Sequence, residues 1–163
     1  MKTKLLYLLT ILSLFIGNAS FTVHHISGTI TATVDGTAQT FNLGASATAT
    51  TAGGINGINI TGSTENGDYG ISIIVTSLTG SVTAGSYYSS GDKFQVQLIY
   101  ASSSGTEGYG NKPFNSSTNA YVRITSIDAS GLQGSFSGKL AMVTGSGSST
   151  KEITAGSFNV TFQ

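Results

Sequence analysis

Alternation of apolar and hydroxyl side chains recurs along the chain from about Ser27 to its end, and it constrains the fold more than any other feature. Between Ile30 and Val34, isoleucine, alanine and valine alternate with threonine. A period of two residues indicates strands with one buried face. Asp35-Gly36 follows, and such a pair between alternating segments predicts a β-hairpin, because both turn positions need positive φ.

The same pattern continues to the C-terminus. Asn66-Gly67 predicts a second hairpin. Leu132 begins an apolar face that includes Gly134 and Gly138, where glycine indicates a bend or the close approach of another backbone. The alternating segments number eight or nine, and none beyond the N-terminal region has the period of a helix. We therefore predict an all-β fold, an antiparallel β-sandwich, with a small closed β-barrel as the alternative.

The N-terminus has the pattern of an export signal. Lys2 and Lys4 precede an apolar run from Leu5 to Ile16, and small residues follow up to Ala19. The run is well short of the roughly 20 apolar residues that cross a membrane. We expect a cleavable signal peptide over residues 1–19, a single all-β domain over 20–163, and a protein that is secreted or held in the periplasm or at the cell surface.

Composition excludes several partners. Charged residues are only 9% of the chain, and removal of the signal leaves a weakly acidic protein. A phosphate backbone attracts clustered basic residues, so we expect no nucleic-acid partner. The chain has no cysteine, which excludes disulfides, thiolate metal sites and a lipid anchor on cysteine. We expect no transmembrane segment after signal cleavage.

Three features together resemble a known group of proteins: the repeated Gly-Ser-aromatic sequence at Gly85 and Gly156, the alternating segment from Leu132 to Leu140, and the final Ile-Thr-Ala-Gly-Ser-Phe-Asn-Val. The chain is similar to the small secreted all-β proteins of unknown function that are common in Bacteroidota. This resemblance implies an extracellular β-fold and brings no catalytic residues with it.

The sequence offers little for catalysis. Its only histidines, His24 and His25, precede the first strand, and chain termini are poorly placed to act as bases. Asp35, Asp68 and Asp128 lie at hairpin turns, where aspartate is common for structural reasons. No pair of carboxylates stands out as the flanking acids of a glycosidase. We predict that the protein is not an enzyme and has no cofactor and no metal site.

Binding is the function that the sequence favours. The segment from Ala101 to Asn119 lacks a clear period and is long for a connection in a small domain, and such loops are either functional or flexible. Aromatic rings beside small polar groups suit the faces and hydroxyls of neutral sugars, while packing into the core is the competing role for each ring. The candidate ligand-binding residues are Tyr87, Tyr88, Tyr109, Lys112 and Phe114.

Three functions follow as hypotheses. The first is a secreted binding or adhesion domain for neutral glycans or for a surface protein. The second is a structural component of an extracellular matrix that self-associates through its uncharged sheets, in which case exposed strand edges matter. The third is a small outer-membrane β-barrel, although most of the strands are shorter than the roughly ten residues such a barrel needs.

Overall fold

The computed structural model describes residues 28–52, 55–89, 93–111 and 117–163, and within these ranges every regular element is a strand. The eleven strands are β1 (Gly28–Val34), β2 (Thr37–Thr40), β3 (Leu43–Ala52), β4 (Ile55–Ser63), β5 (Tyr69–Ser77), β6 (Gly85–Tyr88), β7 (Phe94–Ser102), β8 (Gly108–Gly110), β9 (Asn119–Asp128), β10 (Gly131–Thr144) and β11 (Thr150–Thr161). The predicted all-β class is confirmed. The count exceeds eight or nine in part because β6 and β8 have only four and three residues, too few to show a period.

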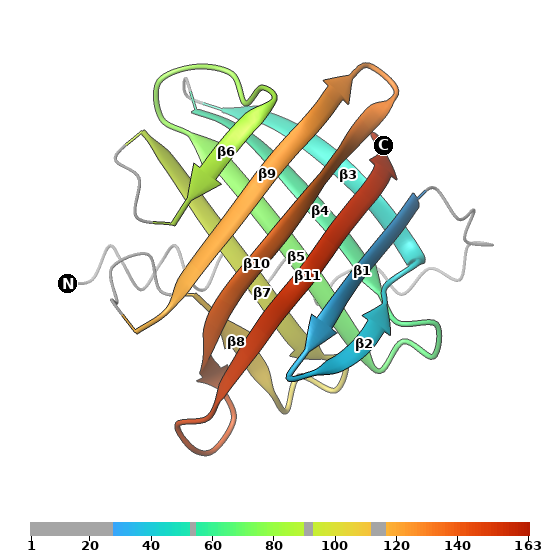
Figure 1. The fold of residues 1–163 in the computed structure, drawn as a ribbon, viewed down its shortest axis with the longest axis vertical. Helices are drawn as coiled ribbons and strands as arrows, with labels where there is room; N and C mark the ends of the chain where they lie inside the picture. The colour runs from blue at the N-terminus through green and yellow to red at the C-terminus, as the bar shows by residue number, and fades with distance from the viewer. Residues whose placement is uncertain (1–27, 53–54, 90–92, 112–116) are drawn as a thin grey trace.

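The strands form two antiparallel layers (Figure 1). The front layer of Figure 1 has the order β6-β9-β10-β11-β1-β2, and the back layer has the order β8-β7-β5-β4-β3. Strands of the two layers run in crossing directions in this view. The apolar faces meet between the layers, and the arrangement is the β-sandwich that the sequence predicts.

Strand β10 joins the two layers at one corner because it is longer than its neighbours. Its residues 131–139 pair with β9 in the front layer. Its end, from Ala141 to Thr144, pairs with β8, whose other neighbour is β7 of the back layer. At the opposite corner, a single bridge joins Ala47 of β3 to Phe162 after β11. The ladder of paired strands stays open, with β2 and β3 at its two ends, so the closed alternative does not form.

Turn chemistry fixes the predicted hairpins. Asp35 and Gly36 have φ of 47° and 80°, as a two-residue turn between twisted strands requires. Gly67 has φ of 73° in the turn between β4 and β5. The close approach expected at the two glycines of β10 is also confirmed: a Cβ on Gly138 would lie 2.7 Å from the carbonyl oxygen of Asn119.

The core lies between the layers and takes one side chain in two from most strands. Inward residues of all the longer strands are almost fully buried, and each such side chain stabilises the fold by about 1.5–3 kcal/mol. The largest fully buried side chains are Phe41, which lies between β2 and β3, and the strand residues Ile30, Ile60, Ile71, Ile73, Leu98, Ile124, Leu132, Leu140 and Ile153. The outer faces carry the serine, threonine, asparagine and glutamine that alternate with them.

Candidate functional site

Two tyrosines come together on the outer face of the front layer. Tyr88 ends the edge strand β6, and Tyr121 lies opposite it on β9. Successive side chains of a strand point to opposite faces. Tyr87 therefore points into the core while Tyr88 points outward, and the buried Ala120 and Val122 leave Tyr121 on the outer face.

The two rings form an exposed aromatic pair. Their centroids are 4.9 Å apart and their planes are tilted by 42°. Tyr88 keeps 55% of its surface exposed, while Tyr121 is half-buried between its neighbours. The hydroxyl oxygens of Ser86 and Tyr121 are 3.2 Å apart, within hydrogen-bond distance. We call Tyr88, Tyr121 and Ser86 the tyrosine platform.

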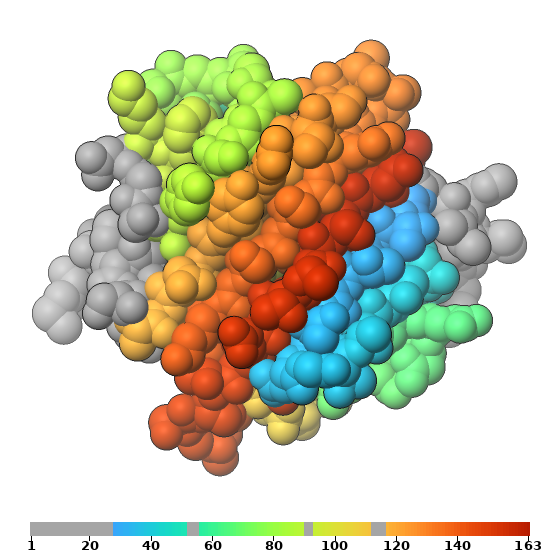
Figure 2. Space-filling model, viewed as in Figure 1, coloured from blue at the N-terminus to red at the C-terminus, as the bar shows by residue number. Residues whose placement is uncertain are grey.

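Small polar groups continue from the platform across the front layer. Ser137 of β10 lies opposite Tyr121, and Arg123 of β9 lies between Ser86 and Ser135. Figure 2 shows β6, β9, β10, β11 and β1 side by side on this face, without a deep hollow across it. The surface is thus flat and rich in hydroxyl groups, with two aromatic rings at one side and few charged side chains. A flat surface of this kind can bind an extended ligand but encloses no small molecule.

Tyr87, a predicted binding residue, is in the core. It is 3% exposed, and its ring packs edge-on against Phe94 at a centroid distance of 4.8 Å. Its hydroxyl donates to the Thr83 carbonyl at 2.5 Å and accepts from the Thr83 N–H at 2.9 Å. The ring therefore packs in the core, and the hydroxyl holds the segment that leads into β6.

Tyr109, a second predicted binding residue, is also buried, with 4% of its surface exposed. Its ring lies 6.4 Å from that of Tyr100, and the Lys151 ammonium lies 5.5 Å from its centroid. The hydroxyls of Tyr109 and Ser149 are 3.3 Å apart. Lys112 and Phe114, the remaining predicted residues besides Tyr88, lie outside the described residues.

The predicted loop from Ala101 to Asn119 contains a strand and is therefore not one continuous loop. Strand β7 extends to Ser102, and β8 follows after a turn. The turn is closed by the Ser102 N–H, which donates to the Glu107 carbonyl at 2.9 Å. Strand β8 has three residues, two of them glycine, so neither period nor propensity marks it in the sequence.

The acidic side chains with shifted pKa values accept hydrogen bonds at turns and strand ends. Hydrogen bonds from the Ser130 hydroxyl and backbone lower the pKa of Asp128, which closes the β9–β10 turn. The Asp35 carboxylate accepts from the Lys151 ammonium and from the Glu152 N–H, both at 2.8 Å, and these bonds lower its pKa. Within the described residues, no group of three or more His, Asp or Glu is placed to hold a metal ion.

A shallow depression of about 90 Å³ lies beside the β9–β10 turn. It is lined by Ser126, Asp128, Gln133 and Asn159 among others, and its carboxylate is already engaged by Ser130. It holds no aromatic ring. The depression therefore follows from turn geometry and offers less for recognition than the tyrosine platform.

Tyr121 was not among the predicted binding residues. The alternation of β9 places it outward, which the sequence shows. Its position opposite Tyr88 depends on the pairing of β6 with β9, and these strands are more than 30 residues apart in the chain. Periodicity reveals faces but not the register between distant strands.

Comparisons with protein-family models, with curated proteins and with solved structures give no match. The described part of the chain has no helix with the length and apolar character that a membrane crossing requires.

Proposed function

We propose that this chain is a secreted, non-catalytic binding domain that takes neutral glycans on the tyrosine platform. The observation that carries the proposal is the outward pair of Tyr88 and Tyr121, 4.9 Å apart on a face lined by hydroxyls. Sugar rings present apolar C–H faces that stack on aromatic rings, and their hydroxyls pair with small polar groups beside the rings. Export is supported by the signal pattern of residues 1–19.

Because the Tyr88 ring is largely exposed, we infer that the pair has a role other than packing in the core. A buried tyrosine such as Tyr87 stabilises the core, but more than half of the Tyr88 surface is in water. Tyrosine is enriched at binding surfaces because it supplies a large rigid contact area at little cost in conformational entropy. The neighbouring Ser86 and Ser137 present hydroxyls that can donate or accept toward a sugar.

Neutral ligands suit the charge of the site. Arg123 and Lys139 are the basic groups on the outer faces of β9 and β10, and neither takes part in an ion pair in the described residues. They are isolated, so they do not form the cluster that a polyanion would need. The shifted carboxylates Asp35 and Asp128 are held by hydrogen bonds in turns, which supports a non-catalytic role.

A glycan array probed with the purified protein tests the proposal. The wild type should bind neutral oligosaccharides, and Tyr88→Ala and Tyr121→Ala should each weaken binding by about tenfold, the loss expected for one stacked ring of about 1–1.5 kcal/mol. Val143→Ala is the matched control, because Val143 is also a large exposed apolar residue but lies at the far end of β10. An empty array, or equal losses in the Val143 control, would refute glycan binding at the platform.

A further inference from the structure

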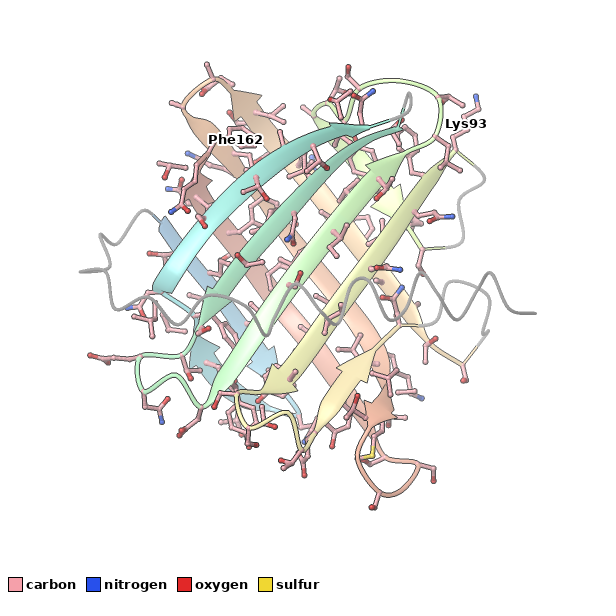
Figure 3. The ribbon with its side chains drawn as sticks, turned by 180° about the vertical axis from the view of Figure 1, so that it is seen from behind. Lys93 and Phe162 are labelled. Carbon is pink, nitrogen blue, oxygen red and sulfur yellow. The ribbon has the colours of Figure 1, made fainter. Side chains whose placement is uncertain are left out.

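The back layer ends in a long strand, β3. Strand β3 has ten residues, whereas β2 and β6 at the edges of the front layer have four each. Very short edge strands are one of the ways in which proteins prevent pairing with other chains. On the outer edge of β3, Ala47 forms a bridge to Phe162, whose side chain lies beside β3 in Figure 3, and the Ala45 N–H donates to the Asn42 carbonyl at 3.4 Å.

The backbone of β3 shows which groups face outward. The Ala47 carbonyl accepts from the Gln163 N–H at 2.9 Å on the side away from β4. Backbone groups of a strand alternate in direction from one residue to the next. The N–H and C=O groups of Ala49 and Thr51 therefore also point away from β4.

This part of β3 lacks the features that block edge pairing. Residues 48–51, Thr-Ala-Thr-Thr, are all exposed, and the pairing with β4 is regular from Ser46 to Ala52. The chain has no charged residue and no proline between Asp35 and Glu65. Charge, proline and bulges are the usual protections of an edge, and none is present along residues 46–52.

We propose that this edge of β3 binds a second copy of the same chain, antiparallel about a two-fold axis at Thr50. In that register Ala49 of each copy lies opposite Thr51 of the other, and the N–H and C=O groups that point away from β4 at these two residues bond across the interface. A two-fold interface brings each surface against itself, so any charge on the strand would meet its own sign. The absence of charge between Asp35 and Glu65 removes this repulsion.

The resulting dimer is closed. Each copy uses its one long edge, and the short strands β2 and β6 offer little for further growth. The tyrosine platform lies on the front layer, so the dimer does not depend on the proposed glycan site and can fail or succeed independently of it.

Cross-linking tests the register directly. Thr50 would lie opposite its own copy as a pair without mutual backbone bonds, with Cα atoms about 4.5 Å apart, which is within disulfide range. Because the chain has no cysteine, Thr50→Cys introduces a single thiol. Under mild oxidation it should form a disulfide-linked dimer rapidly, while Thr37→Cys on the short edge β2 should not. Equal cross-linking of the two variants would overturn the proposal.

Solution mass provides the second test. Light scattering should give twice the chain mass for the wild type and the Thr37→Lys control, and a single chain mass for Thr50→Lys and Ala49→Pro. Thr50→Lys places like charges opposite each other, and Ala49→Pro removes an outward donor without touching the bonds to β4. A monomeric wild type, a fibre, or a dimer that persists in Thr50→Lys would each show that the edge does not act in this way.

Discussion

Asn111 is held against Leu98 of β7 by a pair of hydrogen bonds that continue the sheet after β8 has ended. The Asn111 side-chain oxygen accepts from the Leu98 N–H at 2.7 Å. Its side-chain amide donates to the Val96 carbonyl at 2.8 Å, and its own N–H donates to the Leu98 carbonyl at 3.3 Å. Asn111 is 7% exposed, so water does not replace these bonds easily.

Asn111→Ala should therefore destabilise the fold well beyond an average surface change. It leaves the buried Leu98 N–H and Val96 carbonyl without partners, and each unsatisfied group costs about 1–3 kcal/mol. We expect a loss of about 2–4 kcal/mol in the free energy of unfolding, measured by urea denaturation. Asn159→Ala, at an exposed asparagine of β11, is the control and should change stability by less than about 0.5 kcal/mol.

The ion pair of Asp35 and Lys151 should give a small, pH-dependent stabilisation. The Lys151 bond is the main cause of the lowered Asp35 pKa, and the Asp35 bond raises the Lys151 pKa. Because the Asp35 pKa is lower in the folded than in the unfolded chain, its contribution is complete above about pH 4 and is lost as the pH falls through the folded value. The Lys151 contribution is lost only as the pH rises above about 10.4.

Asp35→Asn isolates this charge, since asparagine tolerates the positive φ of the turn and can still accept from Glu152. Both side chains of the pair are partly in water, so we expect a loss of only about 0.5 kcal/mol at pH 7 and low salt. The difference from wild type should shrink toward zero near about pH 2. Urea denaturation at both pH values checks this, and a difference that grows on acidification would contradict the assignment.

Gly134 should not tolerate a side chain. A Cβ at this position of β10 would overlap the Arg123 carbonyl oxygen and the Phe158 ring, and the carbonyl belongs to the paired strand β9. We expect Gly134→Ala to cost about 1–3 kcal/mol, as overpacking does in other cores. Gly80→Ala, where a Cβ would meet nothing, should stay within about 0.5 kcal/mol of wild type. Equal thermal midpoints for the two variants would show that β9 and β10 can move apart.

The elements that the sequence predicts well are those whose signals are local. Alternation places Ile30 and Val34 in a buried face, and Asp35-Gly36 fixes the hairpin that follows. Local signals fail at β11, where Ala155 rather than the adjacent Gly156 takes the positive φ, at 48°. The register of β11 against both neighbours shifts around this residue, so tertiary pairing sets the conformation against the preference of alanine.

The candidate site is less predictable because it depends on contacts between distant strands. The aromatic doublet at Tyr87 and Tyr88 is visible in the sequence, but which ring is exposed follows from the inward face of β6. Tyr121 becomes part of the site only through the pairing of β6 with β9. Tyr109 appears in the sequence as a loop aromatic, and its burial follows from the placement of β8 between β7 and β10.

The most direct test of the account follows the tyrosine ring resonances by NMR while a neutral oligosaccharide that binds on the array is added. The signals of Tyr88 and Tyr121 should shift together and saturate, and those of Tyr87 and Tyr109, which lie in the core, should stay in place. Tyr88→Phe should keep the response, since it retains the ring. Shifts confined to other residues, or no shift of Tyr88 and Tyr121 at saturating sugar, would contradict the proposal that this pair is the binding surface.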